Sequence, residues 1–145
     1  MKAAVVYKRA NRIYLHASSK TTAGVWIATP PIIQVDSGSS PSDLGKSVMD
    51  VLGGSQALVP HPTKWSGLLA PLLEQAGVKS WETFMRKSQC LNLEATEDRL
   101  KLIPNRNLGT TEGFEPMLDK AIDVPLTSSP DQIGTALTDA LALCQ

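Results

Sequence analysis

Two stretches of the chain carry the clearest structural signal: Ser39–Leu52, SSPSDLGKSVMDVL, and Ser128–Leu141, SSPDQIGTALTDAL. In each, a serine precedes a proline and apolar residues then recur on one helical face, which predicts a capped amphipathic helix. Six of the fourteen paired positions are identical. Capped amphipathic helices share such features without common ancestry, but the segments before the two copies also match in order. We therefore expect an internal duplication of residues 1–53 and 90–145, with a helical segment 61–88 between them.

Extended segments precede both copies. Residues 2–7 and 12–19 predict a hairpin, because Ile13, Leu15 and Ala17 alternate with more polar neighbours on the second strand. Further strands are expected at 25–28, 32–35, 90–94, 100–103, 114–117 and 121–124. The dipeptide Pro30-Pro31 should interrupt the chain between two of them, since proline is confined to strand ends, edges and bulges.

The segment between the copies predicts two helices. Thr63 can cap the first, which should kink at Pro71 and end at Gly77. Ser80 can cap the second, from Trp81 to about Ser88. The predicted fold class is α+β: a mainly antiparallel sheet of short strands from two related β-β-β-α halves, with helices packed against it, in one domain spanning 1–145.

Composition excludes several classes of protein. The 145 residues carry 14 basic and 14 acidic side chains, so overall basicity gives no reason to bind nucleic acid or acidic membranes. The chain begins with only five apolar residues between charges, too few for a signal peptide, and no stretch approaches a membrane span. We expect a cytoplasmic protein with no direct nucleic-acid or membrane partner.

Few residues suggest chemistry. Cys90 and Cys144 are far apart in sequence and are expected to be buried free thiols. His16 is expected on the polar face of a strand, and His61 lies between two prolines. Neither has a metal-ligand partner at a suitable spacing, and no nucleophile or phosphate-loop motif is present. We expect no metal, no cofactor and no catalytic residues.

Charge is distributed unevenly along the chain. Residues 1–35 contain five basic and no acidic side chains, whereas residues 107–145 contain six acidic side chains and one lysine. The acidic segment can form a surface that steers a basic partner. Alternatively, the two regions neutralise each other within the fold. The sequence leaves both alternatives open.

Several motifs together resemble the CdiI immunity proteins of bacterial contact-dependent growth inhibition (CDI) systems. The likeness covers nearly the whole chain and includes the closing helix to Cys144. The motifs are SSKTTAGVWIA at 18–28, PHPT at 60–63, GVKSW at 77–81 with TFM at 83–85, PNRN at 104–107 and GFEP at 113–116.

This resemblance implies a small protein that binds the C-terminal toxin domain of a cognate CdiA effector and blocks it by stoichiometric occlusion. Such toxin domains are often nucleases, which present basic surfaces to their substrates. From charge and aromatic character we expect the toxin-binding residues in the acidic segment, with aromatic anchors if these are not in the core. The candidates are Glu112, Glu115, Asp119, Asp123, Phe114 and Trp26, with Trp65 as a further exposed anchor.

Rival hypotheses remain. A small enzyme would use His61 or His16 with a carboxylate, and an interaction or assembly factor would bind some other protein. A nucleic-acid-binding module would use the basic hairpin residues Lys8, Arg9, Arg12 and Lys20. A polar cluster could also form from Lys20, Thr21, Thr22, Asn105 and Arg106, although these side chains are expected to bond loop backbone.

Overall fold

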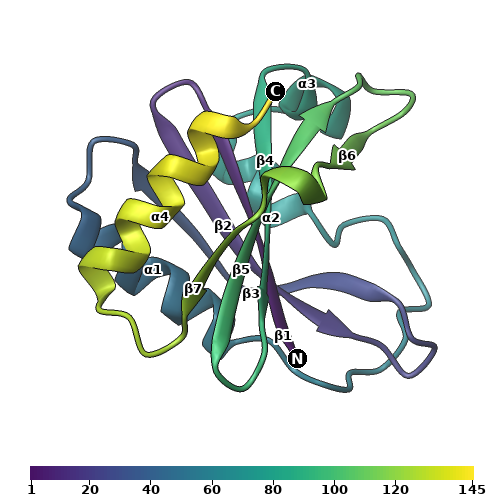
Figure 1. The fold of residues 1–145 in the computed structure, drawn as a ribbon. Helices are drawn as coiled ribbons and strands as arrows, with labels where there is room; N and C mark the ends of the chain where they lie inside the picture. The colour runs from purple at the N-terminus through teal and green to yellow at the C-terminus, as the bar shows by residue number, and fades with distance from the viewer.

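A computed structural model describes residues 1–145 and places seven strands in one sheet (Figure 1). Every strand pairing is antiparallel, in the order β3-β2-β1-β4-β5-β6, and β7 pairs with β5 on the same side as β6. The expected α+β class is confirmed. The strands are β1 (Lys2–Arg9), β2 (Arg12–Lys20), β3 (Trp26–Asp36), β4 (Ser88–Ala95), β5 (Arg99–Asn107), β6 (Phe114–Pro116) and β7 (Ile122–Pro125).

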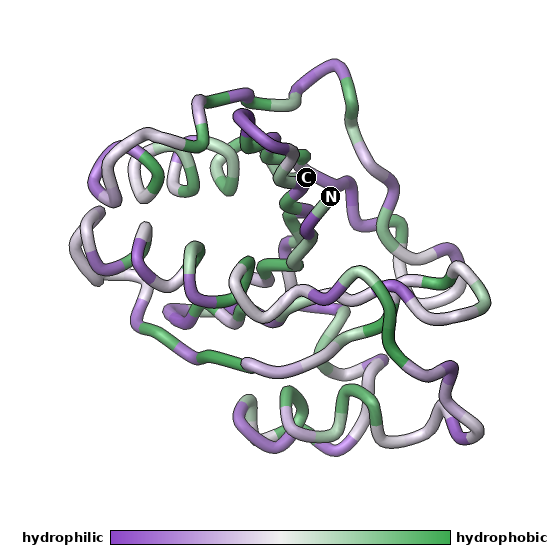
Figure 2. Tube along the Cα trace, turned by 90° about the horizontal axis from the view of Figure 1, so that it is seen from below, coloured by the Kyte–Doolittle hydropathy of each residue, from purple (hydrophilic) through white to green (hydrophobic).

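Helices cover the sheet unequally. The long helices α1 (Pro41–Gly53) and α4 (Pro130–Leu143) run side by side, as Figure 2 shows from below. Ser40 and Ser129 accept hydrogen bonds from the amides of Asp43 and Gln132, as the capping patterns predict. The helices α2 (Ala70–Ala76) and α3 (Trp81–Arg86) and the 3-10 turn η1 (Leu118–Lys120) are short.

The two faces of the sheet bury two separate clusters. Nineteen buried residues form the main core between the sheet and the pair α1 and α4, and strand residues such as Val6 and Leu15 reach it. The second cluster lies on the other face, where Tyr7 and Tyr14 pack against Leu72 of α2 and Phe84 of α3. Because side chains alternate along a strand, neighbours such as Val6 and Tyr7 enter different clusters.

Two glycines allow α1 and α4 to touch through their backbones. A Cβ atom added at Gly45 would overlap the carbonyl oxygen of Pro130, and one added at Gly134 would overlap the carbonyl oxygen of Pro41. The contact is therefore reciprocal, with the same position of each helix lying on the first residue of the other. Glycine is needed at both positions because there is no room for a side chain.

The sheet has the same order on both sides of its centre. β1 and β4 pair in the middle, β2 and β3 follow on one side, and β5 and β7 follow on the other. With α1 after β3 and α4 after β7, three strands and one helix of each half correspond in an approximately two-fold arrangement, and β6 is an additional strand of the second half. This arrangement agrees with the expected duplication, which stays a prediction.

The structure corrects two local expectations. Pro30 and Pro31, joined by a cis peptide, lie within one continuous strand β3, and the pairing of β2 with β3 shifts register between His16 and Ala17 to accommodate them. The first of the two middle helices starts at Ala70 instead of following Thr63, so Pro71 lies in its first turn. Amides of the first turn have no partner within the helix, so the missing N–H of proline costs no hydrogen bond there. Pro71 thus lies in the first turn of this helix instead of kinking it.

The glycine contact gives a stability prediction. Gly45→Ala and Gly134→Ala should each lower the free energy of unfolding by about 1–3 kcal/mol, because the backbone of the facing helix must move away. Urea unfolding followed by circular dichroism measures the change. Gly53→Ala is the matched control, since its added Cβ meets no atom within 4 Å, and it should leave stability unchanged or raise it. Wild-type stability of Gly45→Ala would contradict the close contact.

Candidate functional site

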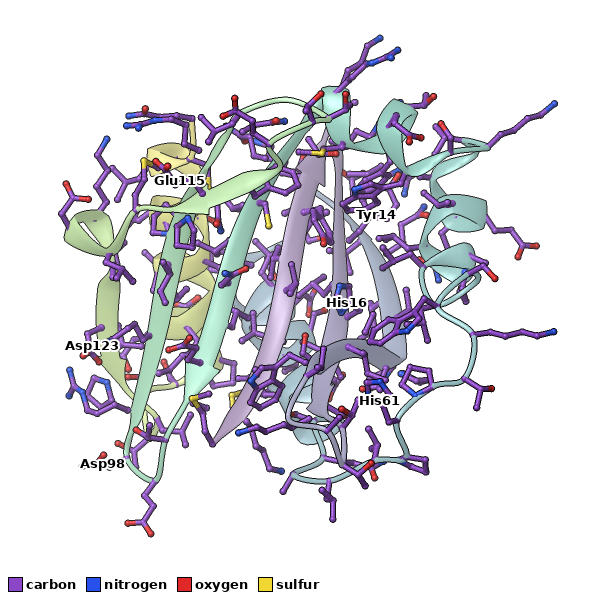
Figure 3. The ribbon with its side chains drawn as sticks, turned by 90° about the vertical axis from the view of Figure 1, so that its right-hand side faces the viewer. Tyr14, His16, His61, Asp98, Glu115 and Asp123 are labelled. Carbon is purple, nitrogen blue, oxygen red and sulfur yellow. The ribbon has the colours of Figure 1, made fainter.

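The structure places the six candidate binding residues on opposite sides of the sheet. Glu112, Phe114, Glu115, Asp119 and Asp123 belong to β6, β7 and the turns beside them, whereas Trp26 begins β3 at the other edge. Figure 3 shows Glu115 and Asp123 along one side and His61 toward the other. The six residues therefore do not form one surface patch.

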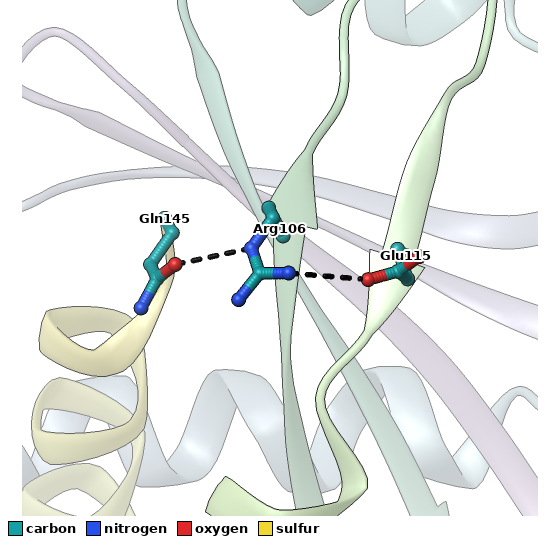
Figure 4. Close-up of polar contacts among 3 residues, drawn as sticks. All are labelled: Arg106, Glu115 and Gln145. Atoms are coloured by element: carbon teal, nitrogen blue, oxygen red, sulfur yellow. Dashed lines mark hydrogen bonds and ion pairs between the residues drawn. The ribbon is translucent and has the colours of Figure 1, made fainter.

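Two of the four candidate carboxylates are paired within the chain. Arg106 Nη1 lies 3.4 Å from Glu115 Oε1, and its Nε donates to Gln145 Oε1 at 3.1 Å (Figure 4). Arg99 Nε donates to Asp123 Oδ1 at 2.9 Å. Both pairs are about half exposed, so water screens them and they add little to stability. Their main effect is to cancel the charges of Glu115 and Asp123.

Glu112 and Asp119 are the two candidates that remain exposed without an ion-pair partner. The arginines that neutralise the other two lie on β5, not in the basic segment 1–35. Neutralisation within the fold is thus partial, and it comes from the neighbouring strand. Among the four candidates, Glu112 and Asp119 keep a free negative charge, and the side chain of Leu118, next to Asp119 in the chain, is 69% exposed. We call these three residues the acidic edge.

The aromatic candidates have different environments. Phe114 is half-buried and packs on Tyr7, with ring centroids 6.1 Å apart, so it belongs to the second cluster. Trp26 is 36% exposed and Trp65 is 51% exposed. Both tryptophans therefore have surface available for contact with a partner.

An apolar pocket of about 560 Å³ lies between β1–β3 and the segment that leads into α2. Trp26 and Trp65 line it together with Trp81 from α3, so all three tryptophans of the chain contribute. The sequence did not indicate Trp81 as a pocket residue, because its place depends on α3 folding back over β1. Val5, His16, Ser18 and Ala28 of the three strands also line the pocket.

The expected exposure of His16 is wrong. Its side chain is buried, because β2 is an inner strand covered on both faces and seven of its nine residues are buried. The Nδ1 atom lies 2.8 Å from the carbonyl oxygen of Ala17, which can only accept, so Nδ1 carries the proton. Burial lowers the pKa of His16, and the hydrogen bond to Ala17 acts in the opposite direction. His16 is therefore a neutral imidazole with Nε2 as an acceptor.

His61 is exposed and takes part in a small local network. Its Nδ1 atom lies 3.0 Å from Thr21 Oγ1, and its ring meets Trp65 edge-on at 5.2 Å between centroids. Thr21 Oγ1 also accepts hydrogen bonds from the amides of Ala23 and Val25. Thr21 thus supports loop backbone, as expected.

Two other residues of the expected polar cluster, Asn105 and Arg106, lie on β5, far from Thr21, and stabilise the fold there. Asn105 is buried and donates to the carbonyl oxygens of Cys90 and Ile103. Arg106 forms the ion pair with Glu115. Lys20 and Thr22 flank Thr21 at the β2–β3 end of the sheet, so the five residues do not form one cluster.

The cysteines are buried free thiols, as expected. Burial is the main cause that raises the pKa of Cys90 and also that of Cys144, so both stay protonated at neutral pH. No three His, Cys, Asp or Glu side chains are grouped as metal ligands require. The four helices are also too short or too polar to cross a bilayer.

An α+β domain with exposed carboxylates at one edge and exposed tryptophans around an apolar pocket has the surface of a protein that binds another protein. The family model described as CdiI, CDI immunity protein, matches residues 59–144. The chain therefore belongs to the CDI immunity protein family, and it is an immunity protein.

Solved structures share its fold. A protein of unknown function from Neisseria meningitidis is 18% identical, with a TM-score of 0.82 over 99% of this chain and 95% of that one. A CdiA-CT/CdiI toxin and immunity complex from Yersinia pseudotuberculosis contains a chain that is 19% identical, with a TM-score of 0.80 over 99% of this chain and 97% of that one. No curated protein matches the chain in sequence.

The buried neutral imidazole makes a prediction about stability and pH. Because the pKa of His16 is lowered in the folded state, the unfolded chain binds more protons below about pH 6.5, and the stability from this residue is lost as pH falls. Between pH 7.5 and 5.0, His16→Gln should therefore lose less unfolding free energy than the wild type, by at most about 2 kcal/mol.

Urea unfolding at the two pH values measures this difference. His61→Gln is the control, since the imidazole of His61 is exposed, and it should keep the wild-type loss. If His16→Gln and the wild type lose the same free energy between the two pH values, His16 is not a buried neutral group.

Proposed function

We propose that this immunity protein binds the C-terminal toxin domain of a cognate CdiA effector in the cytoplasm of the producing cell. It neutralises the toxin by stoichiometric occlusion of its active site or substrate surface, without turnover. The family match over residues 59–144 is the observation that carries this proposal. The likeness of the fold to a chain of the Yersinia pseudotuberculosis toxin and immunity complex supports it.

The acidic edge is the proposed contact with a basic toxin surface. Glu112 and Asp119 carry the free charge, and the exposed side chain of Leu118 lies next to Asp119 and offers apolar area. A toxin that acts on nucleic acid has a basic substrate surface, so two unpaired carboxylates there speed the encounter and favour this orientation. The paired carboxylates Glu115 and Asp123 contribute less, because Arg106 and Arg99 already neutralise them.

Binding without turnover is supported by the partners of the two histidines. His16 Nδ1 bonds to a main-chain carbonyl, and His61 Nδ1 bonds to the hydroxyl of Thr21. A histidine that acts as a general base needs a substrate proton within reach and a group that orients its ring, and this orienting group is commonly a carboxylate. The small-enzyme alternative therefore has little support at either histidine.

The nucleic-acid alternative is also weak. Lys8, Arg9 and Arg12 lie near the β1–β2 turn, whereas Lys20 ends β2. Eight residue steps along a strand separate Arg12 from Lys20 by roughly 26 Å. The basic side chains of the hairpin are thus spread over the length of the sheet.

A paired expression experiment tests the proposal. The tagged chain and the CdiA C-terminal domain encoded upstream should co-purify as a one-to-one complex, and the chain should restore growth to cells that express this toxin domain. A chain that neither forms the complex nor restores growth would refute the proposal. His61→Gln should still restore growth, because no catalytic step is involved, and a variant that forms the complex but fails to protect would point to catalysis instead.

The acidic edge has its own test. The double variant Glu112→Gln/Asp119→Asn should lower the association rate with the toxin domain about tenfold at low salt, with a smaller effect at high salt. Asp50→Asn/Asp139→Asn removes the same charge from exposed positions of α1 and α4 and serves as the control. Surface plasmon resonance at two salt concentrations measures the rates. Equal rates for both double variants would contradict the proposed role of the acidic edge.

A further inference from the structure

We propose that the apolar pocket receives a tyrosine or tryptophan side chain of the toxin domain as an anchor of the complex. The proposal rests on the proposed function and names the chemistry of a second contact, on the other side of the sheet from the acidic edge.

The walls of the pocket are held by aromatic packing. Trp81 stacks on Phe84 at 5.5 Å between centroids and meets Tyr7 edge-on at 5.7 Å. On the wall formed by Trp65, the ring of His61 packs edge-on against the indole, and His61 Nδ1 forms a hydrogen bond with Thr21 Oγ1. Since these rings already have fixed neighbours, little conformational freedom is lost when a partner binds.

The floor of the pocket offers one acceptor. His16 lines the pocket and is only 3% exposed, and its Nδ1 proton is used by the carbonyl oxygen of Ala17. The Nε2 atom of His16 makes no hydrogen bond within the chain, and it is accessible to solvent. A lone pair in an apolar pocket requires a donor from the occupant. The phenol of tyrosine and the indole of tryptophan combine a flat apolar ring with such a donor.

The surface around the mouth favours a protein over a small molecule. Val25 is 41% exposed and Leu58 is 67% exposed. Val25 directly precedes Trp26, which lines the pocket, and Leu58 precedes Val59, which is bridged to Thr21 in the same group of loops. An occupant confined to the pocket would leave these side chains in water. A protein that inserts one ring can cover them as well.

Charge at the mouth further defines the partner. No charged side chain lines the pocket. Lys20, paired in register with Trp26, and Lys64, next to Trp65, are both exposed beside it. The toxin segment that carries the aromatic anchor is therefore expected to have carboxylates next to it.

Binding of variants to the purified, catalytically inactivated toxin domain tests the proposal. Trp65→Ala removes a half-exposed wall, and Ala28→Phe fills the pocket from β3. Each should raise the dissociation constant at least tenfold in calorimetry, with an unchanged melting temperature for Trp65→Ala. Leu143→Ala is the matched control for the pocket, because it removes an exposed apolar side chain from α4, on the opposite face of the sheet, and it should leave affinity unchanged.

A scan of the toxin domain identifies the anchor. One Tyr→Ala or Trp→Ala substitution there should weaken binding as much as Trp65→Ala does, with little further loss when the two are combined. If the wild type binds but Trp65→Ala and Ala28→Phe bind equally well, or if no aromatic substitution in the toxin matters, the anchor proposal is overturned and the proposed function stands. If the wild type itself forms no complex, the proposed function fails and the anchor proposal fails with it.

Discussion

The close contact between α1 and α4 is the constraint on which the rest of the structure depends. Gly45 and Gly134 let the two helices approach until backbone meets backbone, and this places both helices on the same face of the sheet. That face then closes into the main core of nineteen buried residues. With both long helices on one side, only the short helices α2 and α3 are left for the other.

This unequal cover explains where binding surface is found. On the second face, α2 and α3 form a cluster of only five buried residues with the sheet and leave part of that face uncovered. The uncovered part becomes the pocket lined by Trp26, Trp65 and Trp81. A protein whose task is to bind needs exposed aromatic surface, and here that surface exists because two short helices cannot cover what two long helices cover on the opposite side.

The fold also changes how charge is distributed over the surface. The acidic C-terminal part of the chain is less acidic in the folded protein than in the sequence, because β5 brings Arg99 and Arg106 beside Asp123 and Glu115. Because these arginines lie on β5 and not in residues 1–35, the basic and acidic ends of the sequence do not neutralise each other. Glu112 and Asp119 at one edge, and Lys20 and Lys64 beside the pocket, keep their charges. A partner that meets both regions must carry complementary charge in two places.

The amino-acid sequence alone determined the elements whose signals are local. Capping serines and apolar periodicity predicted α1 and α4, alternation predicted the hairpins, and the order of motifs pointed to the immunity family, because these depend on neighbours along the chain. Only the tertiary structure decided the burial of His16, the partners of Glu115 and Asp123, and the meeting of three tryptophans at one pocket. Each of these depends on which strand lies beside which, and on which face a helix covers. Such contacts join residues far apart in sequence, so no local pattern encodes them.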